Sequence, residues 1–438
     1  MKRIVQQSIF LIFISLNLQA QEVNILDFGA DPSGKFENSD LINILVDSLS
    51  TSGGGTVYVP KGKYLLNDAI ILKSNISLKG ENSNETIFFR DSVKGGWSIS
   101  KAQGLITTNP AAANHNIHVS HVQVNGNFKK KASRGKAGIA LRNCSKSSIK
   151  DVQTFNTWHG VAFYDFKGDD SQNIIDRVIS TNAHTFTSKD NSGRPRGILS
   201  VDPGSKILNS KSFNAGTGFY AYGKNITLEG NHAEGWFEDN GYYLIVDNLT
   251  VKNCSAKGGP SPEKGYGSGF AIGYKKGALI ENNLAENCDN YGFRIHVPQS
   301  NTKLINNRAI GCGNGFGIET ASHPYPEVSS DIYMEGNLAQ NSGIHGFLFR
   351  QMENSQVLNN KAINGNQRML TLSTRGAIAL KDYLKNNTFS NNICEDNQNK
   401  KTQLYGLYDF SVNDIKSASK KGKNNKIKHK SKSGKDVF

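Results

Sequence analysis

The sequence predicts an all-β fold, a solenoid in which short strands stack turn upon turn. The main observation is a recurring apolar phrase that begins at Gly138, Gly160, Gly197, Gly218, Gly241, Gly269, Gly292, Gly315 and Gly346. The last six glycines are separated by 23, 28, 23, 23 and 31 residues, with Asn-rich phrases such as NNLAENC between them. A period above twenty residues with alternating apolar positions is typical of a strand solenoid. The 44 Gly and 10 Pro also suit many tight turns better than long helices.

The first twenty residues have the pattern of a signal peptide. Lys2 and Arg3 precede a short apolar run, Ile9 to Leu16, and Leu18-Gln19-Ala20 ends in a small residue. We therefore expect cleavage before Gln21 and a secreted or periplasmic protein, with no insertion in a membrane. The predicted domains are a signal peptide over 1–20, a β-helix over 22–413 and a basic tail over 414–438.

The net charge of +14 is concentrated at the ends of the chain. Residues 414–438 carry nine Lys and two Asp, and this composition predicts a disordered, solvated tail. The β-helix body keeps a modest excess of about five positive charges, so no nucleic-acid partner is expected. Five cysteines, an odd number without a CxxC pair, argue against a disulfide framework and against a thiolate zinc site.

The stretch before the first repeats predicts one amphipathic helix. Leu41, Ile42, Leu45, Val46 and Leu49 recur at helical spacing, and Gly53-Gly54-Gly55 follows them. We expect this helix to cover the open N-terminal end of the solenoid, where unpaired backbone groups and the core would otherwise meet water.

The same stretch carries a family resemblance. DFGA at Asp27–Ala30, GGGTVYVP at Gly53–Pro60 and GKY at Gly62–Tyr64 resemble the N-terminal signature of the pectate-lyase-like superfamily. The resemblance implies a right-handed parallel β-helix and action on polysaccharides, without naming a reaction. The chain has Asn38-Ser39-Asp40 where the family usually has Asp-Asp-Thr, which we interpret as a changed helix cap.

Alternation along each strand assigns side chains to two faces. The first and third residues after each Gly are apolar and are predicted to point into the core. The second and fourth residues, with the residue before Gly, are predicted to point outward. Three insertions, around His184 to Arg196, in GGPSPEKGYGS and in ASHPYPEVSS, flank this set of strands. Long loops beside one face of a regular scaffold commonly build a binding site.

The outward positions carry Tyr, Arg, His and Glu instead of the Thr, Ser and Lys of a solvated sheet. We predict four catalytic residues: Tyr243, Arg294, His296 and Glu319. Ala271 and Gly273 have little or no side chain, and they are expected to leave a hollow between Tyr243 and Arg294. Tyr rings stack on sugars and Arg binds carboxylate or sulfate. The predicted substrate-binding residues are Arg142, His159, Tyr164, Tyr220, Tyr222, Asn240, His345 and Arg350.

This set of residue types fits β-elimination from a uronate. Arg294 or Arg350 neutralises the carboxylate, His296 next to Glu319 takes the C5 proton, and Tyr243 or Tyr222 protonates the leaving oxygen. We therefore predict a polysaccharide lyase that acts as a monomer on an acidic polysaccharide. A bland alternative is that Arg294 and Glu319 form a diagonal surface ion pair and that His296 is a rim residue.

Three other functions stay open. A C5-epimerase uses the same groups and returns the proton to the opposite face. A glycoside hydrolase needs two carboxylates, Glu319 with Asp239 or another loop acid, and the Asn-Thr-Asp motif of polygalacturonase-type hydrolases is absent. A non-catalytic carbohydrate-binding β-helix is the third. No cofactor is predicted; the outward columns lack clustered carboxylates, which leaves a calcium ion only as an alternative.

Overall fold

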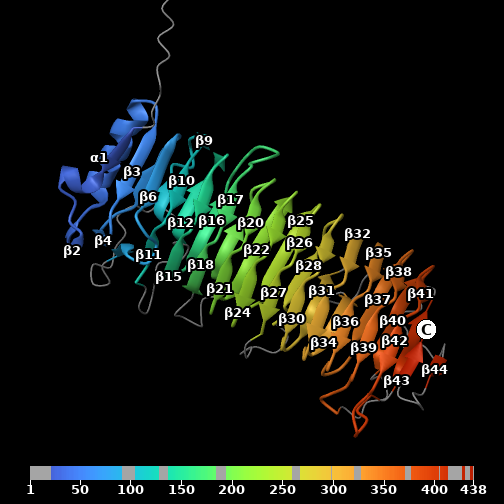
Figure 1. Ribbon diagram of the computed structural model, residues 1–438. Helices are drawn as coiled ribbons and strands as arrows, with labels where there is room; N and C mark the ends of the chain where they lie inside the picture. Colours follow the sequence, from blue (N-terminus) through green and yellow to red (C-terminus); the bar gives the residue numbers. More distant parts are fainter. Residues whose placement is uncertain are drawn as a thin grey trace, which may run out of the picture.

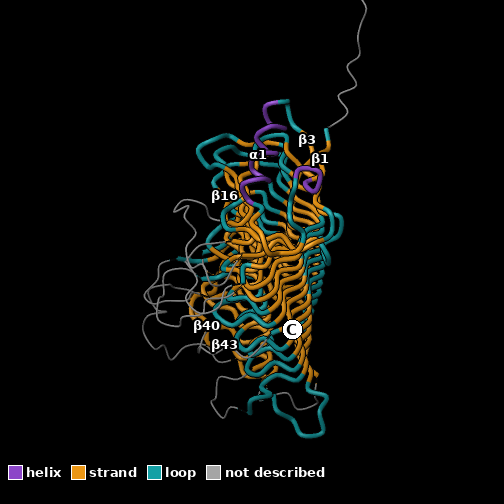
Figure 2. The backbone as a smooth tube through the Cα atoms, turned by 90° about the vertical axis from the view of Figure 1, so that its left-hand side faces the viewer, coloured by secondary structure: helices purple, strands orange, loops and turns teal. Residues whose placement is uncertain are grey.

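The computed structural model describes residues 21–90, 104–127, 137–183, 194–258, 267–296, 298–319, 327–369, 376–403, 405–412, 427–429 and 435–437. The predicted signal peptide and most of each predicted insertion lie outside these residues. The described strands stack along one axis from the N-terminal to the C-terminal end as a parallel β-helix (Figure 1). The predicted all-β solenoid is confirmed. Seen after a quarter turn, the strands remain stacked in regular layers along an elongated body (Figure 2).

The strands form three parallel ladders, and each turn of the coil contributes in sequence to them. Ladder 1 contains β5 (Ile70–Leu72), β8 (Gly104–Thr108), β12 (Ala137–Arg142), β16 (His159–Tyr164), β19 (Arg196–Ser200), β22 (Thr217–Lys224), β25 (Tyr242–Asp247), β28 (Phe270–Gly273), β31 (Tyr291–His296), β34 (Asn314–Glu319), β37 (Phe347–Glu353), β40 (Gly376–Lys385) and β43 (Tyr405–Val412). Its strands begin at or beside the recurring glycines.

Ladders 2 and 3 complete each turn. Ladder 2 contains β1 (Glu22–Asn24), β3 (Gly55–Val59), β6 (Ile76–Gly80), β10 (His118–Ser120), β14 (Ser148–Lys150), β17 (Ile174–Asp176), β20 (Lys206–Leu208), β23 (Thr227–Glu229), β26 (Thr250–Lys252), β29 (Leu279–Glu281), β32 (Ser300–Ile305), β35 (Ser329–Glu335), β38 (Gln356–Leu358) and β41 (Thr388–Ser390). Ladder 3 contains β2 (Ser33–Glu37), β4 (Gly62–Leu66), β7 (Thr86–Arg90), β11 (Gln123–Asn125), β15 (Gln153–Thr157), β18 (Ile179–Ala183), β21 (Lys211–Phe213), β24 (His232–Glu234), β27 (Ser255–Lys257), β30 (Leu284–Glu286), β33 (Arg308–Ile310), β36 (Leu338–Gln340), β39 (Lys361–Ile363) and β42 (Ile393–Glu395). Two short strands, β9 (Asn114–His115) and β13 (Cys144–Ser145), pair separately.

The helix predicted near the N-terminus is present as α1 (Ser39–Thr51), after a short 3₁₀ helix, η1 (Ile25–Phe28). Ile42, Leu45, Val46 and Leu49 are its buried apolar residues and belong to the same core as the strands. Asn38 occupies the N-cap position and makes no side-chain capping bond. That α1 protects the end of the coil from water remains a prediction.

Stacked aromatic rings form the core behind ladder 1. They are the first residues after successive glycines: Phe219, Tyr242, Phe270, Phe293, Phe316 and Phe347. Neighbouring ring centres lie 4.4–4.9 Å apart with planes within 8° of parallel. All six rings are fully buried, so the predicted inward columns are confirmed. Each ring therefore contacts its neighbours in the turns before and after it.

The recurring glycine is required by a close approach across the coil. A Cβ on Gly197 would lie 1.9 Å from Ser212 Oγ of ladder 3, and a Cβ on Gly292 would lie 2.6 Å from the Ala309 Cβ. In the pairing of β31 with β34, Tyr291 pairs with Asn314 and Phe293 with Phe316, whereas the glycines between them, Gly292 and Gly315, are not paired. Glycine and the residue after it therefore both face the core, and the residue before glycine faces out.

Most of the predicted C-terminal tail lies outside the described residues. Within it the structure describes β44 (Ile427–His429) and β45 (Lys435–Val437), which pair antiparallel with β43 and β42. All five cysteines are buried. In the described part of the chain no helix is both long and apolar enough to cross a membrane.

Candidate active site

The outer face of ladder 1 carries the predicted site. The outer face consists of three positions in each turn: the residue before the recurring glycine, and the second and fourth residues after it. Tyr243 pairs with Ala271, which pairs with Arg294, and His296 pairs with Glu319, so the predicted order of these residues along the coil is confirmed. The predicted hollow is partly occupied, because a Cβ on Gly273 would lie 2.5 Å from the His296 Cβ.

His296 is a buried imidazole between two tyrosines. Its ring stacks on Tyr274 at 5.3 Å between centres and meets the edge of Tyr243 at 6.4 Å. Its Nδ1 is buried and has no hydrogen-bond partner among the described residues. Burial, reinforced by the positive charge of Arg294, lowers the pKa of His296 to about 3. The imidazole is therefore neutral near pH 7.

Glu319 is engaged with arginine and not with His296. Its carboxylate lies 3.0 Å from Arg294 Nη2 and 3.9 Å from Arg350 Nη1. Among the described residues it forms no ion pair or hydrogen bond with His296. The two residues are ladder partners, as predicted, but the carboxylate is directed at the arginines. The structure thus contains the diagonal Arg294–Glu319 ion pair that was the non-catalytic alternative.

Two further residues complete this charged group. Arg350 Nε donates to Asp382 Oδ2 at 2.5 Å. Tyr291, the residue before Gly292, covers Gly317, where an added Cβ would lie 2.3 Å from its ring. Burial and the nearby Glu319 carboxylate raise the pKa of Tyr291, so its phenol stays protonated. Arg294 and Arg350 are thus both held by acids of the chain.

Tyr243 belongs to an aromatic row that continues toward the N-terminal end. Its ring lies 5.8 Å from that of Tyr220, and the Arg196 guanidinium lies 3.6 Å from the Tyr220 ring centre. Burial, with a contribution from the Asp239 carboxylate, raises the pKa of Tyr243 to about 12. The phenol therefore carries its proton at neutral pH, as an acid catalyst must.

Asp239 is a buried carboxylate at the centre of the arginines. Its Oδ2 lies 2.6 Å from Arg194 Nη1, and its Oδ1 accepts from Asn240 Nδ2 at 2.6 Å. Burial raises the pKa of Asp239, and Arg194, Arg196 and Arg294 oppose that rise. Asn240 in turn accepts a hydrogen bond from the Ser268 amide at 3.1 Å. The Asn240 side chain therefore connects the Asp239 carboxylate to the backbone at Ser268.

His159 and His345 are both residues before glycine. The His159 Nδ1 accepts the Arg196 amide at 3.1 Å, which leaves Nε2 as the protonated nitrogen of the neutral ring. Burial and the Arg196 charge lower the pKa of His159 to about 3. His345 is buried, and its amide donates to Asn314 Oδ1 at 3.3 Å.

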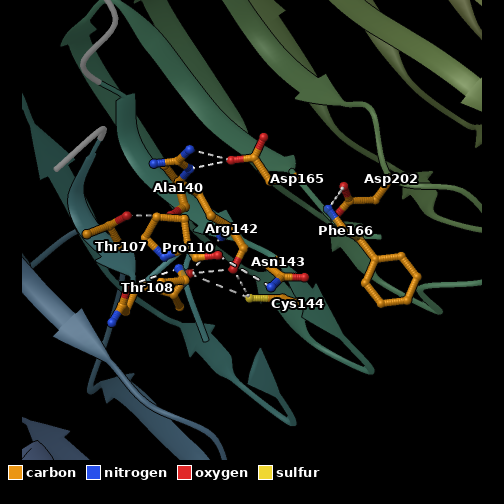
Figure 3. Close-up of polar contacts among 12 residues, drawn as sticks. Thr107, Thr108, Pro110, Ala140, Arg142, Asn143, Cys144, Asp165, Phe166 and Asp202 are labelled. Carbon is orange, nitrogen blue, oxygen red and sulfur yellow. Dashed lines mark hydrogen bonds and ion pairs between the residues drawn. The ribbon is translucent and has the colours of Figure 1, made fainter. Parts of the chain in front are cut away.

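The remaining predicted residues lie apart from His296. Arg142 contacts Asp165, with Nε 2.6 Å from Oδ2, and lies over the Tyr164 ring at 5.3 Å. Figure 3 shows this arginine directed at Asp165, with Asp202 beside Phe166. Arg142 is in β12, six turns before β31, which is about 29 Å along the coil. Tyr222 is 46% exposed and contacts Lys275.

Three residues of the site were not predicted from the sequence, namely Arg196, Tyr274 and Tyr291, and Asp239 was predicted only as the carboxylate partner of Glu319 in the hydrolase alternative. Arg196 and Tyr291 had a usable signal, because both directly precede a phased glycine. Asp239 lies outside the columns, and Tyr274 follows a strand in a turn with positive φ of 62°. Among the described residues no group of three His, Cys, Asp or Glu is arranged to hold a metal ion.

Similar proteins include polysaccharide-modifying enzymes and a phage tailspike. Alginate lyase 7 of Azotobacter vinelandii is 33% identical over 113 residues, covering 24% of this chain and 13% of that protein. Mannuronan C5-epimerase AlgE3 of the same organism is 22% identical over 333 residues, covering 74% of this chain and 14% of that protein. The tailspike protein of E. coli bacteriophage HK620, as a mutant, is 12% identical with a TM-score of 0.55, covering 90% of this chain and 79% of that chain.

The chain spans less than a sixth of the length of these two curated relatives, and the tailspike likeness supports the fold alone. A family model for the right-handed β-helix region matches residues 196–362, which agrees with the predicted handedness. A second model, described as rhamnogalacturonase A/epimerase, pectate lyase-like, matches residues 22–259, more than half of the 438 residues. The chain belongs to this pectate lyase-like family.

Proposed function

We propose that the chain is an exported, monomeric enzyme that removes the C5 proton from a uronate unit of an acidic polysaccharide, with β-elimination as the outcome. The observation that carries this proposal is His296. It is a neutral imidazole set between Tyr243 and Tyr274, and its buried Nδ1 has no partner in the part of the chain that the structure describes. Buried polar atoms without partners are uncommon and mark sites where a ligand or water completes the bonding.

The surroundings of the imidazole support separate roles for base and acid. His296 is neutral and can accept a proton, while Tyr243 stays protonated and can donate one. In β-elimination the base takes the C5 proton, the C–H electron pair forms the C4–C5 double bond, and the C4–O bond breaks. The phenol then protonates the departing oxygen. Arg294, oriented by Glu319, lies beside the imidazole to stabilise the negative charge that develops.

An acidic substrate would also make the His296 imidazole, which is a weak base in the free protein, a stronger base. Arg294 is the charge that lowers the pKa of His296 after burial. A carboxylate bound beside Arg294 offsets this charge, and the pKa of His296 then rises toward the operating pH, where a general base is most effective. The base is thus strengthened by the acidic group that identifies the substrate.

C5-epimerisation is the second candidate function. It begins with the same proton removal and ends with return of a proton to the opposite face, so the same residues serve. Its support is the relative named as a mannuronan C5-epimerase, which matches 74% of this chain, whereas the relative named as an alginate lyase matches 24%.

Hydrolysis by Glu319 and Asp239 is disfavoured by their positions. Glu319 ends β34, and Asp239 precedes β25 by three residues, three turns away or about 14 Å along the coil. Inverting hydrolases hold their two carboxyl groups roughly 6.5–9.5 Å apart, and retaining ones hold them closer. Both carboxylates are also ion-paired, to Arg294 and to Arg194.

One assay separates these functions. The full chain is incubated with uronate-rich, sulfated and neutral polysaccharides, and the products are followed by near-UV absorbance, reducing ends and proton NMR. New absorbance from a C4–C5 double bond supports the lyase. A changed uronate without cleavage supports the epimerase, reducing ends without absorbance indicate a hydrolase, and retention without product indicates a binding module.

Paired variants test the assigned base. His296→Ala is expected to lower kcat by about 10²–10⁴-fold, the usual contribution of a general base. His232→Ala is the control, because His232 lies in ladder 3 and contacts Ser255 and Glu234. Equal activity of the two variants would place the reaction elsewhere in the chain.

A further inference from the structure

Arg196 differs from the other arginines of the outer face. It is the first residue of β19 and directly precedes Gly197. Its guanidinium carbon lies 3.6 Å from the centre of the Tyr220 ring, and its amide donates to His159 Nδ1. Its Nε is buried and has no hydrogen-bond partner among the described residues. The side chain therefore lies against an aromatic face, and its Nε lacks a partner, as does the Nε of Arg294.

Each of the other three arginines that the structure describes on this face is paired with an acid. Arg142 Nε lies 2.6 Å from Asp165, Arg294 Nη2 lies 3.0 Å from Glu319, and Arg350 Nε lies 2.5 Å from Asp382. Within the described ranges, Arg196 has no carboxylate within 4.0 Å. The nearest candidate, Asp239, is already held by Arg194 and Asn240. Arg196 therefore lacks the negative partner that its neighbours possess.

The two side chains shown in contact with Arg196, those of Tyr220 and His159, are neutral. Burial raises the pKa of Tyr220, so the phenol stays protonated, and it lowers the pKa of His159 to about 3, so the imidazole is uncharged. Burial also lowers the pKa of Arg196 itself. A buried charge without a partner is costly, and a bound anion removes that cost.

We propose that Arg196, held on Tyr220, is a second anion-binding position that takes an acidic group of the polysaccharide away from the reacting unit. Arg196 is in β19 and His296 is in β31, four turns or about 19 Å further along the coil. Tyr220 and Tyr243 lie in the turns between them. The polymer therefore runs along the coil axis over these two rings. This inference rests on the function proposed above.

The acidic group has the chemistry of a carboxylate or a sulfate ester. The planar guanidinium presents parallel N–H donors that match two oxygens of either group. Because Arg196 contacts a unit that does not react, its binding energy is the same in the ground state and the transition state. Loss of the contact then raises KM and leaves kcat unchanged.

The test compares Arg196→Gln, Arg196→Lys and the control Arg177→Gln in the full chain. Arg177 contacts Asp151 and Asp176 and is remote from ladder 1. The probes are a polyuronate, its carboxyl-reduced neutral form, a sulfated polysaccharide and a monomeric uronate. Binding is measured by titration calorimetry, turnover by the assay above, and folding by circular dichroism.

Arg196→Gln is expected to weaken polyuronate binding by about ten- to a hundredfold, the value of a hydrogen bond to a charged group. Arg196→Lys recovers part of this loss, whereas neither variant alters binding of the neutral polymer or the monomer. A loss on the polyuronate alone assigns a carboxylate, and a loss on the sulfated polymer alone assigns a sulfate ester.

Three outcomes would overturn the inference: unchanged affinity of Arg196→Gln for every acidic polymer, an equal loss on the neutral polymer, or a loss in kcat with KM unchanged. Failure of the proposed reaction is a separate result. If wild-type protein binds the polyuronate through Arg196 and forms no product, the second anion position stands while the catalytic proposal falls.

Discussion

Arg294 Nη2 lies 3.0 Å from Glu319 Oε1, and the two side chains are only 16% and 12% exposed. This ion pair joins consecutive turns of ladder 1 diagonally, from the second residue after one glycine to the fourth residue after the next. It fixes the guanidinium beside His296 and explains why Glu319 does not contact the imidazole.

Glu319→Gln is therefore expected to destabilise the fold, because it leaves the half-buried Arg294 without its charged partner. We expect a loss of about 1–3 kcal/mol in the free energy of unfolding, measured with urea. Glu281→Gln is the matched control, since the Lys252–Glu281 pair is at a similar distance of 2.9 Å but more exposed. That control is expected to cost less than about 1 kcal/mol. Equal losses would contradict the reading of Arg294–Glu319 as the stronger pair.

The lowered pKa of His296 predicts a pH dependence of stability. Between the folded value of about 3 and the ordinary value near 6.5, the unfolded chain binds a proton that the folded chain does not. Stability is thus present above the ordinary pKa and is lost as the pH falls toward 3. His296→Phe is expected to reduce the slope by about 1.4 kcal/mol per pH unit in this window, measured by denaturant titration at several pH values. Parallel slopes for wild type and variant would refute a neutral, buried His296.

Tyr243→Phe tests the proposed role of Tyr243 as the acid that protonates the leaving oxygen. The variant keeps the ring but loses the phenolic proton, so kcat is expected to fall by about 10²–10⁴-fold with KM nearly unchanged. The control is Tyr333→Phe, which removes a hydroxyl that donates to Glu335 on ladder 2. If Tyr243→Phe raised KM alone, the ring would serve only to stack on sugar.

The phased glycines predict a steric test of the coil. Gly292→Ala places a Cβ 2.6 Å from the Ala309 Cβ, and overpacking of this kind costs about 1–3 kcal/mol. Gly365→Ala is the control, since the nearest atoms to its added Cβ are 3.5 Å away. The two are compared by thermal and urea unfolding. Indistinguishable stabilities would show that the opposite ladder moves to accept the methyl group.

Much of the fold was predictable from the sequence because the repeat is local. The spacing of Gly218, Gly241, Gly269 and Gly292 places one residue type at the same point in each turn, and stacking then follows from alternation. The aromatic stack from Phe219 to Phe347 and the order of Tyr243, Arg294 and His296 were predicted in this way and agree with the structure.

The partners of these residues were not predictable, because they depend on rotamers and on segments between the repeats. Alternation places Glu319 beside His296, yet its carboxylate extends diagonally to Arg294, where the charge attraction is greater. Asp239 lies in no column, and only folding brings it among Arg194, Arg196 and Tyr243.

By itself, then, the sequence determined the all-β coil, its inward aromatic columns and the face on which polar side chains gather, since each of these follows from a periodic pattern. The tertiary structure alone decided which of those side chains are already paired. Arg294 and Arg350 are engaged by Glu319 and Asp382. Among the described residues, in contrast, Arg196 lies on Tyr220 without an acid within 4.0 Å, and the Nδ1 of His296, between two rings, has no hydrogen-bond partner. Pairing is decided by distances of a few ångströms between side chains on different turns, and no repeat in a linear sequence encodes them.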